Sequence, residues 1–301
     1  MDNFLFFPRS VAAATFDVAF AGASGLTMAR RWLARDLEDR LAKGLQHRAI
    51  ACACAMPAAL FAQAFLAVAT MTGSSNSGSI RRQFVDVMTG THAGRTLLWN
   101  SAIALLFLVM VLVRRLWQTR AGTASLLSLL VVLAATRAAT GHPAADGDFA
   151  LPELVQFVHL ASIAIWSGGV MGAGLIVLPE LLRGKQFEAT GQFARRLSET
   201  VTIALLLIVV TGVYNSYRGL DGSLAPLVGT QWGILLDIKI VLVCLAITMG
   251  AFNRQMLRAN RSLSALQARR LARVLQIEAI VMALILGVSA FLANSPPASS
   301  G

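Results

Sequence analysis

Eight apolar stretches constrain the fold of this chain more than any other feature. A helix of about 20 residues crosses the roughly 30 Å hydrocarbon core of a membrane. Apolar residues make up 56% of the 301 positions and charged residues only 14%, a balance typical of membrane proteins and not of soluble domains. We predict spans at residues 11–28, 49–71, 97–113, 121–140, 154–178, 201–217, 232–252 and 274–293.

Helices are expected in all eight stretches because lipid cannot satisfy exposed backbone groups. The sequence therefore predicts an all-α, polytopic membrane bundle in which residues 1–301 form one membrane domain. Its first four helices would occupy residues 1–140 and its last four residues 141–301. One outer stretch, 72–96, contains a Gly/Ser-rich run at 73–79 that is typical of a flexible loop.

The basic residues lie mostly on one side of the predicted bundle, which explains the net charge of +11 without nucleic-acid binding. They gather in the connections after the first, third, fifth and seventh spans. These are Arg30, Arg31, Arg35, Arg40, Lys43, Arg48, Arg114, Arg115, Arg120, Arg183, Lys185, Arg195, Arg196, Arg254, Arg258, Arg261, Arg269, Arg270 and Arg273. Because cytoplasmic loops carry an excess of Lys and Arg, both termini are predicted to lie outside.

Three of the four histidines fall on that outer side. His142 directly follows the fourth span, His159 lies roughly 9 Å inside the fifth, and His92 precedes the third by a few residues. A histidine inside a membrane is costly unless it faces protein or water, and such residues often mark ion pathways. Because imidazole binds copper and zinc, we predict a metal site formed by His142 and His159, with His92 as a third candidate.

Other side chains are candidates for supporting this site or for a path leading from it. Trp166 shares a helix face with His159, and Gly168 with Gly172 would let a neighbouring backbone approach closely. Asp237 lies in the outer half of the seventh span, where it could orient a ligand imidazole. Met71 and Met88 in outer segments are possible soft ligands.

An ordered set of motifs in the second half resembles the copper resistance protein D (CopD) family. The motifs begin with His159-Leu160, Trp166-Ser167-Gly168-Gly169, Arg196-Leu197-Ser198 and Thr211-Gly212-Val213-Tyr214-Asn215. They continue with Gln231-Trp232-Gly233-Ile234-Leu235-Leu236, Lys239, Gly250-Ala251-Phe252-Asn253-Arg254, Glu278 and Ala293-Asn294-Ser295-Pro296-Pro297. The resemblance covers about residues 141–297, whereas the first four helices match in layout more than in motif.

The resemblance implies a multi-pass protein of the bacterial inner membrane that takes copper ions from the periplasmic side. It also implies a partner, the periplasmic copper carrier called copper resistance protein C, which would here be a separate chain. The leading hypothesis is therefore a copper-binding protein that imports the metal toward the cytoplasm.

Two alternatives remain open from the sequence. The first is a periplasm-facing protein that holds copper and passes it to partners without translocation, since an outer site looks the same in both mechanisms. The second is a membrane redox protein with one haem on His142 and His159, although a two-haem bundle is disfavoured because His47 stands alone on the inner side. An enzyme is not expected, because no nucleophile, base and orienting partner can be assembled.

Overall fold

The computed structural model describes residues 2–33, 35–73, 76–139, 150–220, 230–260 and 262–295, and every regular element within them is a helix. The elements are α1 (Asp2–Trp32), α2 (Arg35–Thr72), α3 (Ser77–Gly90), α4 (His92–Leu112), α5 (Arg114–Gln118), α6 (Arg120–Ala138), α7 (Leu151–Gly172), the π-helical segment η2 (Ala173–Val177), α8 (Leu178–Arg183), α9 (Phe187–Gly219), α10 (Gln231–Ala259) and α11 (Ala265–Asn294). Eight of these helical stretches are long and apolar enough to cross a membrane, which confirms the predicted number of spans.

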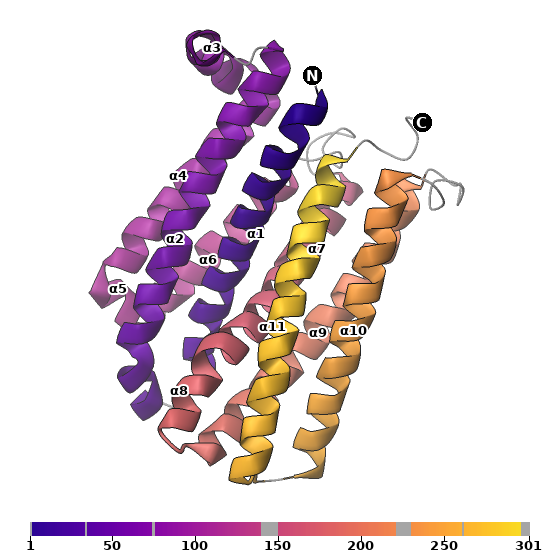
Figure 1. The fold of residues 1–301 in the computed structure, drawn as a ribbon. Coiled ribbons are helices and arrows are strands. Elements are labelled where there is room, and N and C mark those ends of the chain that lie inside the picture. The colour runs from indigo at the N-terminus through magenta and orange to yellow at the C-terminus, as the bar shows by residue number, and fades with distance from the viewer. Residues whose placement is uncertain are drawn as a thin grey trace.

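The spans run roughly parallel as one bundle with two distinct ends (Figure 1). The start of α1, the short helix α3 and the last turn of α11 lie at what we name the terminal end. The helix α8 and the connection from α10 to α11 lie at the opposite end. We name this second end the basic end, because the arginine-rich connections of the sequence are located there.

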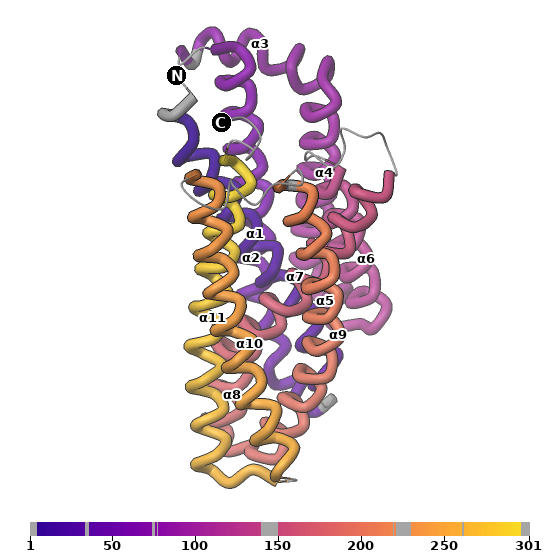
Figure 2. The backbone as a smooth tube through the Cα atoms, turned by 90° about the vertical axis from the view of Figure 1, so that its right-hand side faces the viewer, coloured from indigo at the N-terminus to yellow at the C-terminus, as the bar shows by residue number. Residues whose placement is uncertain are grey.

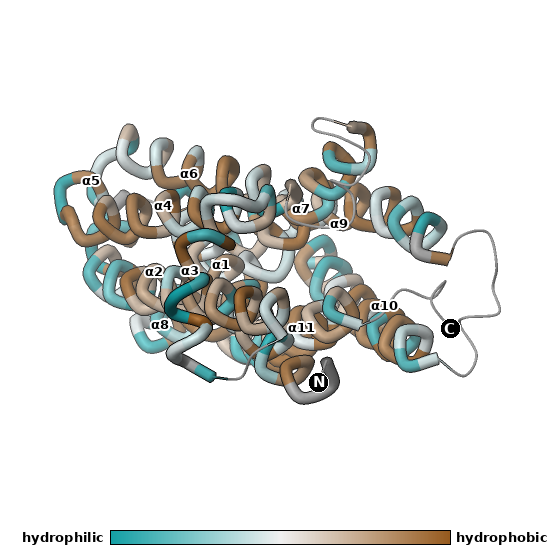
Figure 3. The backbone as a smooth tube through the Cα atoms, turned by 90° about the horizontal axis from the view of Figure 1, so that it is seen from above, coloured by the Kyte–Doolittle hydropathy of each residue, from teal (hydrophilic) through white to brown (hydrophobic). Residues whose placement is uncertain are grey.

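The central helices of the bundle are α1 and α7, the two spans with the largest buried share. α1 packs against α2, α7 and α11, while α7 also packs against α6 and α9. In contrast, α10 is the least buried span, and large side chains such as Val241 and Phe252 face outward. Viewed along the bundle, hydrophobic turns are visible on α4 and α10, as expected for helices in contact with lipid (Figure 3).

The crossing of α1 and α7 depends on glycines, as the pair Gly168 and Gly172 predicted. A methyl group added at Gly25 of α1 would overlap the carbonyl oxygen of Gly168, and one added at Gly168 would overlap that of Ala21. The two backbones are therefore in direct contact. Because this approach fixes α7 in the centre of the bundle, it also fixes the position of every side chain that α7 presents.

Two local features were not predicted. The expected loop at 73–79 gives way at Ser77 to α3, whose N-cap residue Asn76 accepts a hydrogen bond from the backbone N–H of Gly78 at 2.9 Å. α3 lies across the terminal end (Figure 2), with Ile80 and Met88 buried beneath it. The second feature is η2, where Gly174 approaches the backbone of Leu275 in α11.

Candidate metal site

His159 is buried within α7, near the terminal end of the bundle. The helix begins at Leu151, with Pro152 in its first turn and Glu153 just after, both favourable at a helix N-terminus. At 1.5 Å per residue, His159 lies about 12 Å along α7. Only 8% of its surface is exposed, so the ring faces other helices and not lipid.

The partner of the His159 ring is Thr211 of α9, with Nδ1 and Oγ1 2.8 Å apart. The Thr211 hydroxyl also lies 2.6 Å from the carbonyl oxygen of Leu207, to which it donates its one hydrogen. Oγ1 therefore accepts from His159, and the hydrogen-bond pattern assigns the proton of a neutral ring to Nδ1. The lone pair on Nε2 makes no hydrogen bond within the described part of the chain and is suited to a metal ion.

Two further contacts hold α7 and α9 together around this histidine. Asn215 donates from Nδ2 to Oε1 of Gln156 at 2.9 Å, one turn closer to the terminal end. A methyl group added at Gly212 would lie 3.5 Å from Cε1 of His159, an ordinary van der Waals distance. The backbone of α9 therefore lies directly beside the imidazole ring. The ring is thus positioned from both helices, as ligand histidines usually are by their outer hydrogen bonds.

One charged side chain, on α10, interacts with His159, and it is linked in turn to charges on α1 and α6. Lys239 of α10 interacts electrostatically with His159 and with Asp17 of α1. Asp17 also interacts with Arg137 of α6, whose Nη1 donates to Oε1 of Gln63 at 3.1 Å. Charges inside a membrane persist by pairing, and here one acid lies between two bases. His159 therefore interacts with one positive side chain, Lys239, whose charge Asp17 partly offsets.

The other predicted ligands are not brought to His159 by the described structure. His142 lies outside the described residues. His92 is exposed at the first position of α4, which packs on α2, α3 and α6, whereas α7 packs on α1, α6 and α9. Met71 is exposed near the end of α2, and Met88 is buried in α3. Among the described residues no three His, Cys, Asp or Glu side chains form a group that could hold a metal.

Trp166 and Asp237 also differ in position from the predicted site. Trp166 is buried, but it lines a cavity on the basic side of His159, about 10 Å further along α7. Asp237 is exposed on α10, and the charged residue of that helix that interacts with His159 is Lys239. Thr211 and Lys239 belong to the motifs that resemble the family, but nothing local in the sequence links either of them to a histidine on another helix.

Comparison with known families gives matches in both halves of the chain. Residues 191–292 match the family described as copper resistance protein D. Residues 8–151 match the family described as copper resistance protein D-like, N-terminal domain. The first half therefore carries a recognisable family pattern of its own, beyond the general layout of its helices. No solved structure matches the chain.

Two relatives illustrate the range of this similarity. The copper transport protein CutJ of Bacillus subtilis (strain 168) is 28% identical over 163 residues, which cover 54% of this chain and 29% of that protein. An uncharacterized protein of Aquifex aeolicus (strain VF5) is 30% identical over 94 residues, or 30% of this chain and 65% of that protein. The chain thus spans less than two thirds of either relative. With eight spans and a match in each half, the chain belongs to the copper resistance protein D family of multi-pass bacterial inner-membrane proteins.

Proposed function

We propose that this protein binds copper at a site containing His159 and imports the ion toward the cytoplasm. The observation that carries the proposal is the ring of His159, buried near one end of the bundle with Nδ1 held by Thr211 and Nε2 left open. Family membership makes copper the expected cargo, and a relative is named as a copper transport protein. The basic end would face the cytoplasm by the positive-inside rule, which puts His159 near the periplasm.

His142 is proposed as a second ligand and His92 as a third. The proposal for His142 comes from its place in the sequence between α6 and α7, two helices that pack against each other. A single imidazole does not complete a copper site, so at least one more ligand is required from this end of the bundle. Copper would be delivered by a separate periplasmic carrier of the copper resistance protein C type. Transfer from such a purified carrier to the membrane protein would test that partnership.

The experiment combines metal analysis of the purified protein with copper accumulation in cells. His159→Ala and His142→Ala are each expected to lower the copper content of the purified protein and the uptake by cells. His47→Ala is the matched control, because His47 is exposed on α2 at the basic end. If both test variants keep full copper occupancy, the site assignment is wrong.

Retention of copper without translocation is a second candidate function, and one observation favours it. The charge of Lys239 interacts with His159 and opposes the passage of a cation, even though Asp17 offsets part of it. In this case the wild-type protein would bind copper in a manner dependent on His159, while cytoplasmic copper would not change with expression. Import predicts instead that cytoplasmic copper rises with expression, and that substitution of His159 lowers both copper binding and cytoplasmic copper.

A further inference from the structure

A cavity of about 200 Å³ lies between α7, α9, α10 and α11, on the basic side of Trp166. Most of its wall is apolar, with side chains such as Leu197, Val201 and Ile247. Its volume is sufficient for several water molecules at about 30 Å³ each. None of the described residues that line it is a His, Cys or Met, so it lacks the ligands that copper prefers.

Two polar side chains, Glu278 of α11 and Asn253 of α10, face this cavity next to each other. Glu278 is 2% exposed and its Oε2 has no partner in the described structure. Asn253 is 8% exposed, and its side chain lies beside the Glu278 carboxyl and interacts with it. A methyl group at Gly250 would lie 3.6 Å from Oε1 of Glu278, so this glycine leaves the carboxyl open to the cavity. An unsatisfied buried polar atom on a cavity indicates contact with water or a ligand.

No counter-charge neutralises Glu278 within the described residues. The one other charged side chain in the cavity wall is Arg254, whose Nη1 donates to the carbonyl oxygen of Ser198 at 3.2 Å and to the hydroxyl of Thr202. The lining residues from α7 and α9 are uncharged, and α1, η2 and α8 contribute none. A carboxylate in this position carries a large desolvation cost, which a bound proton removes.

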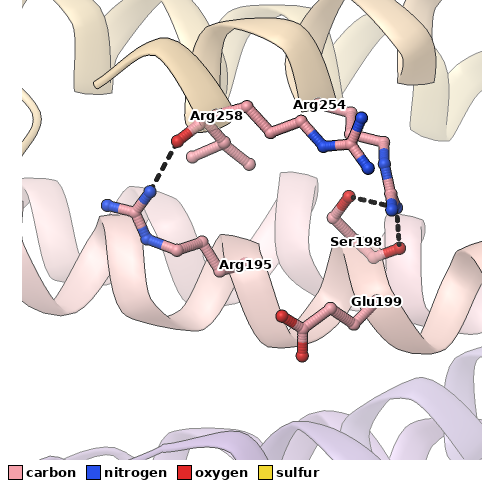
Figure 4. Close-up of a pocket in the computed structure, with 6 residues that line it drawn as sticks. Arg195, Ser198, Glu199, Arg254 and Arg258 are labelled. Atoms are coloured by element: carbon pink, nitrogen blue, oxygen red, sulfur yellow. Dashed lines mark hydrogen bonds between the residues drawn. The ribbon is translucent and has the colours of Figure 1, made fainter. Parts of the chain in front are cut away.

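An adjoining pocket of about 210 Å³ lies between the cavity and the basic end. The two share Ser198, Arg254 and Leu257, and Arg195 and Arg258 line the outer part. Figure 4 shows Arg254 anchored on Ser198 and Arg195 anchored on the backbone of α10, with Glu199 projecting from α9. Arg195 and Arg254 are held by these hydrogen bonds at the walls of the outer pocket.

We propose that Glu278 is a proton-binding site that exchanges its proton with water at the basic end of the bundle. A hydronium ion transfers a proton to the Glu278 carboxylate and leaves a water molecule, and release is the reverse step. Asn253 and water in the cavity would stabilise whichever form is present. The proposal is independent of copper binding, because His159 lies on the other side of Trp166.

Infrared difference spectra of the full-length protein in lipid vesicles would test this proposal. The carbonyl band of a protonated carboxylic acid should disappear as the pH is raised, shift when the glutamates carry carbon-13, and be absent in Glu278→Gln. The isotope shift identifies the band as that of a glutamate, and its loss in Glu278→Gln assigns it to this residue. If no isotope-sensitive band titrates, or if the band persists unchanged in Glu278→Gln, the proposal is overturned.

A hydrophobic carbodiimide supplies a second measurement, because dicyclohexylcarbodiimide adds to protonated carboxyl groups in apolar surroundings. Mass spectrometry should find the reagent on Glu278, with labelling that increases as the pH is lowered. Gly250→Leu should lose most of the label by filling the cavity beside the carboxyl. Gly287→Leu on α11 is the matched control, since nothing lies within 4 Å of the added carbon there. Labelling of Glu278 that does not depend on pH would contradict the proposal.

Discussion

At the scale of single residues, the contact between Thr211 and His159 is the feature most open to a sharp test. Thr211→Val keeps the shape of the side chain but leaves Nδ1–H without its acceptor at 2.8 Å. We expect copper affinity to fall roughly 10–100-fold, as it does when an orienting partner of a metal ligand is removed. Thr211→Ser retains the hydroxyl and should bind nearly as well as the wild type. Competition with a copper chelator measures the copper affinity of both purified variants. Equal affinities for Thr211→Val and the wild type would refute the role of Thr211.

The charges around His159 give a second prediction with opposite signs for two substitutions. Lys239→Gln removes a neighbouring positive charge and should strengthen copper binding, whereas Asp17→Asn removes the acid that offsets it and should weaken binding. A change of about tenfold corresponds to about 1.4 kcal/mol, the interaction energy of two unit charges roughly 12 Å apart at an effective dielectric constant near 20. Lys43→Gln, at an exposed position on α2, is the control and should have no effect.

At the scale of helices, the contact between α1 and α7 should be destabilised by even one added methyl group, although helix propensity alone would favour replacing glycine by alanine. Alanine is favoured over glycine in helices by about 1 kcal/mol, so Gly287→Ala, at an uncrowded position, should be neutral or slightly stabilising. Gly168→Ala should instead lower stability by about 1–3 kcal/mol, because the methyl group would overlap the carbonyl oxygen of Ala21. Thermal unfolding in detergent compares the two, and equal midpoints would contradict a direct backbone contact.

The elements that could be predicted from sequence are those set by hydropathy alone. All eight spans and the close-packing face at Gly168 were predicted, because apolar length and small residues are local signals. The helix α3 was missed because its Gly/Ser-rich start resembles a loop, although the apolar residues Ile80, Phe84 and Met88 recur at helical spacing. The π-helical segment η2 was also not predicted, and its Gly174 lies against the backbone of Leu275 in α11, about a hundred residues away in the sequence.

Of the candidate site, the sequence predicted the position of His159 but not the contacts that this residue makes with other helices. His159 was placed toward the protein interior because its burial in lipid would be costly, and the structure agrees. Thr211 is 52 residues away and meets it only through the packing of α7 on α9. Trp166 was associated with His159 by their common helix face, but two turns of helix separate them along the axis, and Trp166 lines the cavity of Glu278.

At the scale of the whole molecule, an even number of spans brings the start of α1 and the end of α11 to one side (Figure 1). We predict that this side is the periplasm. In a variant without its three cysteines, Thr89→Cys on α3 should react in intact cells with a thiol reagent that cannot cross the membrane. Ser262→Cys, exposed at the basic end, should react only after the membrane is opened. The reverse pattern would place His159 near the cytoplasm and exclude import from this site.

The π-helical segment Ala173–Val177 has a consequence for how the chain tolerates changes in length. Such a segment accommodates one residue more than the regular helix on either side of it. Deleting Leu175, which is half exposed, should restore regular α-helix and keep the faces of α7 and α8 in register, so that folded yield is retained. Deleting Leu160 within α7 should abolish folding, because it rotates every later residue by about 100°. Size-exclusion chromatography compares the two deletion variants. A monodisperse peak for the Leu175 deletion and aggregation of the Leu160 deletion would show that η2, and not α7, accommodates the loss of one residue.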